Sequence, residues 1–319
     1  MSSHYPTGEP TRILLSYPPE DSLPLRLVVF AGVHGNEPSG VWALQRVANH
    51  LVNDKIPLQG RVVGLLGNQK AFRQRVRYCQ EDLNRLFLPE YLEQAHSLPT
   101  GPTDEARELR EILEQVEHCE HHAQGQPFFV DCHTTSSASI PYISLNEGYA
   151  DSFHFTHHMP ATRVLGVEKE IKGCLAEWLN LRGWHGFTFE AGQHDAPIAV
   201  DNQEAIIWLS LLYSGALREE HATNHLNRAQ SILHQQGSQQ ENVYRTLSSF
   251  RINEGDSFRM EPGFVNLQSV SEGQRLAILN DQPVYAPFNG HILMPLYQKQ
   301  GDFGLFMAQE ISHQAALSN

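Results

Sequence analysis

Cysteine, basic residues and long apolar runs are all scarce in this chain of 319 residues. The four cysteines form no CxxC pair, so we expect reduced thiols rather than a disulfide framework. No apolar stretch is long enough to span a bilayer, and residues 1–10 lack the basic start and apolar middle of a signal peptide. The sequence therefore predicts a cytoplasmic protein with no membrane partner.

Lysine and arginine total 23, against 36 aspartates and glutamates, so the formal net charge at pH 7 is −13. Nucleic acid binds to clustered basic residues, so this acidic balance argues against nucleic acid as a partner. A small anionic substrate remains compatible, because a few local cations can hold a carboxylate. The sequence determines no oligomeric state, and a homo-oligomer is compatible with it.

The first two thirds of the chain alternate between strand-like and helical patterns. Helical periodicity predicts one helix after Pro38 and another over residues 103–118. Asp201 and Glu204 resemble a capping box before the apolar run 205–212. Alternation to about residue 217 predicts a three-layer α/β/α domain with a mixed sheet. Short apolar runs predict its buried strands at residues 26–32, 61–67, 128–130 and 186–189.

The composition changes near residue 240, where residues 236–241 form a polar, linker-like stretch. Residues 287–290 contain the Asn-Gly pair of a hairpin turn. We therefore predict a catalytic domain over residues 1–240 and a small all-β domain over residues 241–319. The expected strands of the second domain are residues 246–252, 264–267, 275–279, 284–288, 291–294 and 303–308.

Two histidines and a glutamate follow strand-like runs. His34 and Glu37 come directly after the first predicted strand, and His133 ends the third. Two imidazoles and one carboxylate are the ligand set of a catalytic zinc, which keeps a fourth position open for water. Ligands in α/β proteins gather at the carboxyl ends of strands. The structural alternative is a histidine bonded to a loop carbonyl, with Glu37 as a favourable charge at a helix start.

Two more carboxylates are placed to assist such a site. Asp131 lies two residues before His133, so both face one side of the strand, and Asp131 is a candidate to orient the imidazole. Glu190 ends an apolar strand, where burial would raise its pKa towards neutral and suit it to act as a general base. A salt bridge to a cation is the alternative for Glu190.

A basic segment comes before residue 86. Arg73, Arg75 and Arg77 precede Asn84 and Arg85, and in an acidic protein this concentration predicts an anion-binding wall. Arginine can hold a carboxylate with two parallel hydrogen bonds, and asparagine can add a donor. A charge cluster at a helix end is the structural alternative.

Together these motifs resemble the succinylglutamate desuccinylase/aspartoacylase family, which is related to the zinc carboxypeptidases. The similarity spans about residues 26–217, and the C-terminal β region fits the family's two-part layout. It implies one Zn²⁺ per chain held by His34, Glu37 and His133. It also implies that Glu190 is the base and that Asn84 and Arg85 hold a substrate carboxylate. The motifs are Gly32-Val-His-Gly-Asn-Glu37, Asp82-Leu-Asn-Arg85, Asp131-Cys-His133 and Phe189-Glu-Ala-Gly192.

One stretch departs from the family pattern. The family usually has Asn-Pro-Arg-Ala before Asp-Leu-Asn-Arg, and that arginine polarises the scissile carbonyl. Here the stretch is Asn68-Gln-Lys-Ala71, and Lys70 keeps the charge without the planar guanidinium. Lys70 takes this role, or Arg73 or Arg75 replaces it, or the activity differs. Arg182 is the nearest candidate for a further substrate-binding arginine before the catalytic glutamate.

The sequence thus predicts a zinc-dependent hydrolase that deacylates an N-acyl amino acid or a similar small, carboxylate-bearing amide. Zinc and Lys70 or a nearby arginine would stabilise the tetrahedral oxyanion. The first alternative is a carboxypeptidase acting on peptides, and a C-terminal domain covering the pocket mouth would argue against it. The second alternative is a metal-binding regulatory protein without turnover.

Overall fold

The computed structural model describes residues 11–19, 23–97, 101–236 and 242–317. The predicted absence of a signal peptide concerns residues 1–10, which lie outside the described residues, as do residues 237–241 of the predicted linker. All four cysteines are free thiols, as predicted. Among the described helices, none combines the length and the apolar character that crossing a bilayer requires.

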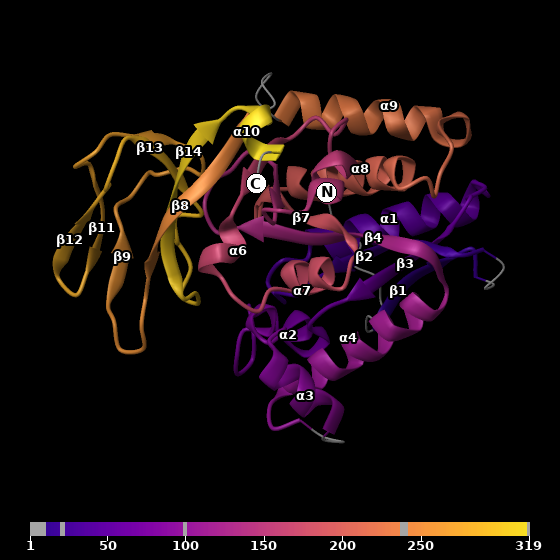
Figure 1. The fold of residues 1–319 in the computed structure, drawn as a ribbon, viewed down its shortest axis with the longest axis horizontal. Helices are drawn as coiled ribbons and strands as arrows, with labels where there is room; N and C mark the ends of the chain where they lie inside the picture. Colours follow the sequence, from indigo (N-terminus) through magenta and orange to yellow (C-terminus); the bar gives the residue numbers. More distant parts are fainter. Residues whose placement is uncertain (1–10, 20–22, 98–100, 237–241, 318–319) are drawn as a thin grey trace.

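An 11-stranded mixed sheet forms the middle of the molecule (Figure 1), in the order β1-β3-β2-β4-β7-β5-β6-β8-β14-β13-β10. A separate three-stranded sheet has the order β12-β11-β9. The strands are β1 (Ile13–Tyr17), β2 (Leu25–Ala31), β3 (Arg61–Leu66), β4 (Ala123–Thr135), β5 (Tyr142–Leu145), β6 (Thr162–Leu165), β7 (His185–Gln193), β8 (Val243–Arg251), β9 (Phe258–Met260), β10 (Ser269–Val270), β11 (Arg275–Leu279), β12 (Gln282–Tyr285), β13 (Gly290–Leu293) and β14 (Phe303–Ile311).

Helices cover both faces of the N-terminal half of this sheet (Figure 1). On one face α1, α8 and α9 pack into one apolar core, and on the other α4 and α7 pack into a second. The helices are α1 (Ser39–Asn53), α2 (Gln69–Gln74), the 3₁₀ turn η1 (Leu83–Arg85), α3 (Pro89–Ser97), α4 (Asp104–His121), α5 (Ala150–Phe155), α6 (Val167–Glu170), α7 (Leu175–Leu181), α8 (Ile198–Tyr213), α9 (Glu219–Gln236) and α10 (His313–Leu317).

The predicted α/β class with a mixed sheet between helical layers is confirmed. All four predicted strands of the first part are present as β2, β3, β4 and β7, and both predicted helices are present as α1 and α4. Strands β2 and β3 are buried almost throughout, which is why they read as continuous apolar runs rather than as alternating patterns. The sequence reading missed α9.

The predicted capping box at Asp201 is wrong. Helix α8 begins three residues earlier, at Ile198, with Pro197 as its N-cap residue. Proline carries no backbone N–H and has a φ suited to a helix start, so the helix begins there without a side-chain cap. Asp201 and Glu204 instead receive hydrogen bonds from Arg46 Nη1, at 2.7 and 3.3 Å.

The C-terminal region contains five of the six predicted strands, with shifted ends, but residues 264–267 are not a strand. The predicted hairpin turn at residues 287–290 is also wrong, because β12 pairs with β11 while β13 pairs with β14. The hairpin of this region joins β11 to β12 instead, through Asn280 and Asp281, whose φ values are 51° and 61°. Asparagine and aspartate tolerate this left-handed conformation better than other side chains do.

The C-terminal strands continue the sheet of the N-terminal part, because β8 pairs in parallel with β6. Glu147 reinforces this join. Its carboxylate accepts a hydrogen bond from Arg245 Nε of β8 at 2.6 Å and pairs with Lys169 of α6. Burial raises the pKa of Glu147, but the hydrogen bonds from Lys169 and Arg245 outweigh burial, so the pKa lies below its usual value.

We expect Glu147→Gln to lower the free energy of unfolding by about 1–2 kcal/mol near neutral pH, because it removes the charge that both cations bind. The pKa is depressed in the folded state, so this stabilisation is present above the usual glutamate value of 4.5 and is lost as the pH falls through the folded value. Urea unfolding should therefore show a larger difference in the free energy of unfolding between the variant and wild type at pH 7.5 than at pH 3.5. The exposed Glu272→Gln is the control, and an equal difference at both pH values would contradict the assignment.

Candidate metal centre and active site

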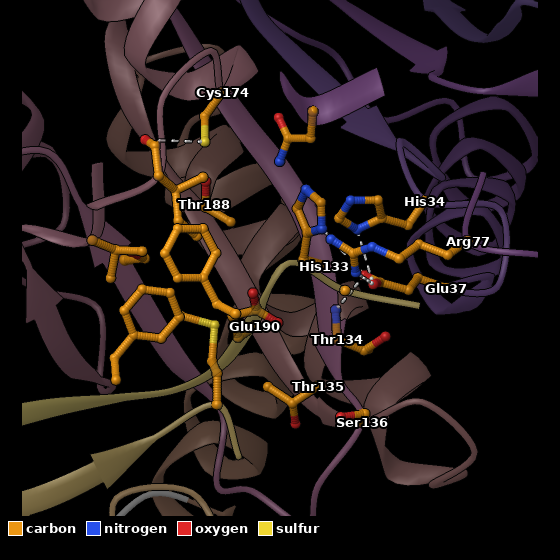
Figure 2. Close-up of a pocket in the computed structure, with 18 of the residues that line it drawn as sticks. His34, Glu37, Arg77, His133, Thr134, Thr135, Ser136, Cys174, Thr188 and Glu190 are labelled. Carbon is orange, nitrogen blue, oxygen red and sulfur yellow. Dashed lines mark hydrogen bonds and ion pairs between the residues drawn. The ribbon is translucent and has the colours of Figure 1, made fainter. Parts of the chain in front are cut away.

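The carboxyl ends of three neighbouring parallel strands bring the predicted residues together (Figure 2). Strand β2 ends at Ala31, and the loop after it carries His34 and Glu37. His133 lies near the end of β4 and Glu190 near the end of β7. These two residues are paired across the parallel ladder between β4 and β7. The topology thus places four residues from separate parts of the sequence at one edge of the sheet.

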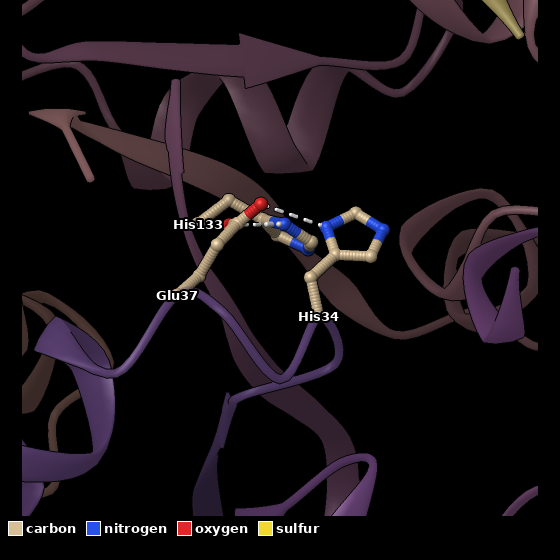
Figure 3. A group of neighbouring side chains, drawn as sticks. All are labelled: His34, Glu37 and His133. Carbon is tan, nitrogen blue, oxygen red and sulfur yellow. Dashed lines mark hydrogen bonds and ion pairs between the residues drawn. The ribbon is translucent and has the colours of Figure 1, made fainter. Parts of the chain in front are cut away.

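His34, Glu37 and His133 face one another in a buried cluster (Figure 3). One oxygen of the Glu37 carboxylate lies 3.0 Å from His34 Nδ1, and the other lies 3.1 Å from His133 Nδ1. One ligand atom from each residue lies within 4.8 Å of the others. Two imidazole nitrogens and a carboxylate, aimed at a common point away from bulk water, have the chemistry and spacing of a divalent metal site.

Close packing against α2 sets the shape of the loop that carries His34 and Glu37. The Gly35 N–H donates to the carbonyl of Arg77 at 3.1 Å. A Cβ atom at Gly35 would lie only 2.1 Å from the backbone carbonyl carbon of Ala71. Glycine is required here because any side chain would push the loop away from α2.

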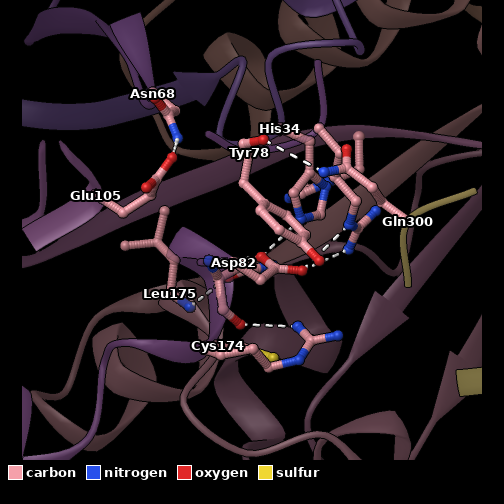
Figure 4. Close-up of polar contacts among 12 residues, drawn as sticks. His34, Asn68, Tyr78, Asp82, Glu105, Cys174, Leu175 and Gln300 are labelled. Atoms are coloured by element: carbon pink, nitrogen blue, oxygen red, sulfur yellow. Dashed lines mark hydrogen bonds and ion pairs between the residues drawn. The ribbon is translucent and has the colours of Figure 1, made fainter. Parts of the chain in front are cut away.

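Each imidazole of the cluster also faces a second carboxylate. His34 Nε2 lies 3.2 Å from Asp82 Oδ1 (Figure 4). His133 Nε2 lies 3.1 Å from Asp131 Oδ2, although the two atoms are not aligned for a hydrogen bond. Such outer carboxylates fix the orientation of metal-binding histidines and raise their basicity. The sequence analysis singled out Asp131 but missed Asp82, although Asp82 begins the Asp-Leu-Asn-Arg motif.

Charge is balanced inside the cluster. Burial raises the pKa of Glu37, but the two histidines outweigh burial and hold the pKa well below its usual value. Burial lowers the pKa of His133, yet Asp131 and Glu37 raise it well above the usual value. The cluster therefore favours a positive charge between its members, as a protein site for a cation must.

Glu190 lies beside this cluster and is buried. Burial raises the pKa of its carboxyl group to about 8, helped by the negative charges of Glu37 and Asp131 and opposed by His133 and Arg77. One of its oxygens has no hydrogen-bond partner among the described residues. A carboxylate with a pKa near neutrality can both take up and release a proton at physiological pH.

Arg77 lies beside the cluster (Figure 2). Its Nε and Nη2 atoms donate to Asp82 Oδ2 at 3.1 and 2.9 Å. Its Nη1 atom lies 3.7 Å from Glu37 Oε1. Asp82 thus contacts both His34 and Arg77, and it holds the guanidinium beside the His34–Glu37–His133 cluster.

A cavity extends from the cluster and is walled by both parts of the chain. Asn84 and Arg85, which the sequence analysis assigned to a substrate carboxylate, line it. Asn84 Oδ1 accepts from the Leu175 N–H at 2.8 Å, and Arg85 forms a bidentate ion pair with Asp302. The C-terminal part supplies one wall through Met294, Leu296, Gln298, Asp302, Phe303 and Phe306.

Comparison with known proteins identifies the relatives of this chain. The sequence model of the succinylglutamate desuccinylase/aspartoacylase catalytic domain matches residues 24–206, more than half of the chain. The chain belongs to this family.

The sequence alignments with individual family members are short. A probable aspartoacylase from Synechococcus sp. is 47% identical over 72 residues, which are 22% of this chain and 23% of that protein. The succinylglutamate desuccinylase of Erwinia tasmaniensis is 38% identical over 74 residues, which are 23% of this chain and 22% of that protein. The matched stretch therefore spans less than a quarter of either relative.

Solved structures match over nearly the whole chain. A succinylglutamate desuccinylase/aspartoacylase from Rhodobacter sphaeroides has a TM-score of 0.63 at 20% identity, covering 91% of this chain and 87% of that one. Murine aminoacylase 3 has a TM-score of 0.55 at 20% identity, covering 90% and 95%. These matches show the fold, and they confirm the predicted zinc-carboxypeptidase-like architecture followed by C-terminal strands.

Lys70 takes the place of the arginine in the family's Asn-Pro-Arg-Ala stretch, but it does not lie at the cavity. Lys70 lies in the first turn of α2, and its ammonium pairs with Asp104 of α4. Among the described residues that line the cavity, Lys70, Arg73 and Arg75 are all missing, whereas Arg77 is present. Helix α2 ends at Gln74, and Arg75 adopts a left-handed conformation with φ 56°, which turns the chain towards the cavity before Arg77.

Arg182 also lies outside the cavity. It follows α7 and forms an ion pair with Glu120 of α4, with its Nε atom 2.9 Å from Oε1. The interpretation of Arg182 as a substrate-binding residue is therefore not supported by its position. Its place in the sequence, shortly before Glu190, carried no information on which way α7 faces.

Proposed function

We propose that this protein is a zinc-dependent amide hydrolase that deacylates an N-acyl amino acid or a similar small amide, and that it works in the cytoplasm. The observation that carries the proposal is the buried His34–Glu37–His133 cluster beside the buried carboxylate of Glu190, within one cavity. The family's succinylglutamate desuccinylases and aspartoacylases give the reaction class. Metal ligands and a base with a near-neutral pKa together favour catalysis over a purely regulatory metal site.

One Zn²⁺ per chain fits the donor set. Nitrogen and carboxylate ligands suit zinc, and three protein ligands leave a position for water or substrate. Zinc at such a site supplies a Lewis acid that polarises a carbonyl oxygen and acidifies water. Asp82 and Asp131 hold the outer faces of the two imidazoles, which presets the ligand geometry.

Glu190 is the proposed general base. Its pKa of about 8 suits it to accept a proton from the attacking water and pass that proton to the leaving amine. Burial excludes solvent from the carboxylate, so the proton is kept within the cavity. This division of roles leaves stabilisation of the developing negative charge to another residue.

Arg77 is the proposed residue for that stabilisation, in place of Lys70. Within the described part of the chain, Asp82 accepts from Nε and Nη2 of Arg77, and Nη1 makes only the 3.7 Å approach to Glu37. The Nη1 group therefore retains N–H donors beside the metal cluster. Fixed donors aimed at a developing oxyanion act strongly in a cavity that excludes water.

A small substrate is favoured over a peptide, because the C-terminal part walls the cavity. The segment between β13 and β14 is tied to the catalytic part at several points. Gln298 Oε1 lies 3.1 Å from Asn36 Nδ2 and 3.2 Å from His194 Nε2, and the Tyr297 N–H donates to Ser136 at 3.1 Å. Turnover of N-acyl amino acids without turnover of short peptides would support a deacylase. The opposite preference would make it a carboxypeptidase.

We expect wild type to bind one zinc per chain and His133→Ala to lose it, because the variant lacks one of three ligands. Metal content after dialysis, measured by mass spectrometry, tests this. Substitution of the exposed His234 by alanine is the matched control and should keep the metal. Full zinc occupancy in His133→Ala would remove this histidine from the ligand set.

Glu190→Gln should keep the zinc and lose turnover by about 10²–10⁴-fold, because glutamine has the same shape but cannot accept the proton. Hydrolysis of a panel of N-acyl amino acids, with metal content measured on the same samples, checks both parts. The variant should unfold no more easily than wild type, since glutamine keeps the shape of the side chain and carries no charge that burial would penalise. Normal turnover by the variant would refute the base assignment.

Arg77→Ala should lower kcat on the order of 10²–10³-fold, because it removes the proposed oxyanion donor. The matched comparison is Lys70→Ala, which removes a cation outside the cavity and should change kcat little. Zinc content must be measured in both, because Arg77 also contacts Glu37. An equal loss of kcat in Lys70→Ala, with zinc retained, would assign the role to the lysine instead.

A further inference from the structure

The arginine that the family resemblance assigns to a substrate carboxylate is already bound to a carboxylate of the chain. Arg85 Nε lies 3.1 Å from Asp302 Oδ2, and its Nη2 lies 2.9 Å from Asp302 Oδ1. The third nitrogen, Nη1, donates to the backbone carbonyl of Asn84 at 2.8 Å. This is the bidentate geometry that arginine uses to bind a carboxylate ligand, and Asp302 fills it.

Asp302 is held where it can make this pair. Its own carbonyl accepts from the Ile252 N–H at 2.8 Å. The segment before it is tied to the catalytic part through Gln298 and through Gln300, whose side chain donates to the Tyr78 carbonyl at 3.4 Å (Figure 4). The Arg85–Asp302 pair therefore lies at the join between the two parts of the chain, on a segment whose backbone is held in place.

The charges along the cavity wall leave no free arginine for a substrate carboxylate. Among the described residues that line it, Arg77 and Arg85 are the only lysines or arginines. Asp82 neutralises Arg77, and Asp302 neutralises Arg85. Glu168 also lines the cavity, and one of its oxygens is buried without a hydrogen-bond partner among the described residues. A substrate carboxylate placed next to Asp302 would be repelled by the like charge and would gain no positively charged partner.

Apolar side chains also line the cavity that Arg85 and Asp302 line. Val167 and Ile171 contribute to it from α6 and the turn after it, and Met294, Phe303 and Phe306 contribute from the C-terminal part. The same side chains belong to or pack against one buried apolar cluster. Apolar walls with few polar groups bind neutral, hydrophobic parts of a ligand.

We propose that Asp302 stands in for a substrate carboxylate at Arg85 and makes the site select amides whose group at this position is uncharged and apolar. The proposal rests on the proposed amide hydrolase function. Of the substrates named there, it favours small amides without a carboxylate over N-acyl amino acids, and it replaces the carboxylate-bearing substrate expected from the sequence. Asp302 is the specificity-determining residue, because it both satisfies Arg85 and repels a competing anion.

Three amides that differ only in one carboxylate test the proposal on the zinc-loaded, full-length protein. N-butyryl-leucinamide is neutral, N-butyryl-leucine has a carboxylate on the amine side, and N-succinyl-leucinamide has one on the acyl side. Wild type should hydrolyse the neutral amide best. Asp302→Asn should raise kcat/KM for one carboxylate-bearing amide, relative to the neutral amide, by about tenfold or more, because Arg85 becomes free to bind it.

Asp281→Asn is the matched control. It makes the same substitution at an exposed turn of the C-terminal part and should leave the ratio of kcat/KM values unchanged. Adding Arg85→Met to Asp302→Asn should abolish the gain. The proposal is overturned if wild type prefers either carboxylate-bearing amide, or if Asp302→Asn leaves the ratio unchanged.

Calorimetric binding of the same three amides to wild type and to Asp302→Asn separates this proposal from the proposed function. Tighter binding of a carboxylate-bearing amide by Asp302→Asn, without hydrolysis of any amide, would refute the hydrolase function and support the role of Asp302. Hydrolysis with no change in selectivity or in binding would support the hydrolase and refute the role of Asp302.

Discussion

The buried carboxylate of Glu37 is the group on which the rest of the site depends. It faces His34 from its own loop and His133 from a strand 96 positions further along the chain. It also accepts the Thr134 N–H at 2.8 Å. A buried charge of this kind is costly unless every lone pair has a partner. The loop after β2 and the end of β4 must therefore stay together for the fold and for the candidate metal centre alike.

Around this carboxylate, positive and negative side chains are paired before any ligand binds. Asp82 joins His34 to Arg77, Asp131 faces the outer side of His133, and the chain also neutralises Arg85 with its own carboxylate. Such internal pairing fixes the orientation of each side chain, so little reorganisation is needed when charge develops in the cavity. Glu190 is the exception: burial raises its pKa to about 8, because His133 and Arg77 only partly offset the loss of solvent.

The C-terminal strands do more than extend the sheet. Because β8 pairs with β6, the segment between β13 and β14 reaches the carboxyl edge of β2, β4 and β7. The division into domains at residue 240 remains a prediction, but the cavity is complete only with residues from both sides of it. One wall of the cavity and the candidate metal centre thus come from different parts of one continuous sheet.

The sequence by itself determined which residues are candidates for the site, because each of them is marked by a local pattern. His34, Glu37, His133 and Glu190 each lie at or just after the end of an apolar strand, and parallel strands bring their carboxyl ends to one edge of a sheet. The α/β class followed from the same strand and helix periodicities. Spacing and the alternation of elements singled out these residues, and the family resemblance assigned their roles as ligands and base.

Only the tertiary structure decided which cation faces the cavity and what that cation binds. Lys70 and Arg77 lie seven positions apart. Lys70 faces α4 from the first turn of α2, whereas the left-handed Arg75 that ends the helix turns the chain before Arg77, which reaches the candidate metal centre. The partner of Arg85 lies 217 positions away. Side-chain direction after a turn, and pairing across such distances, depend on how whole elements pack together, and no local pattern in the chain records that packing.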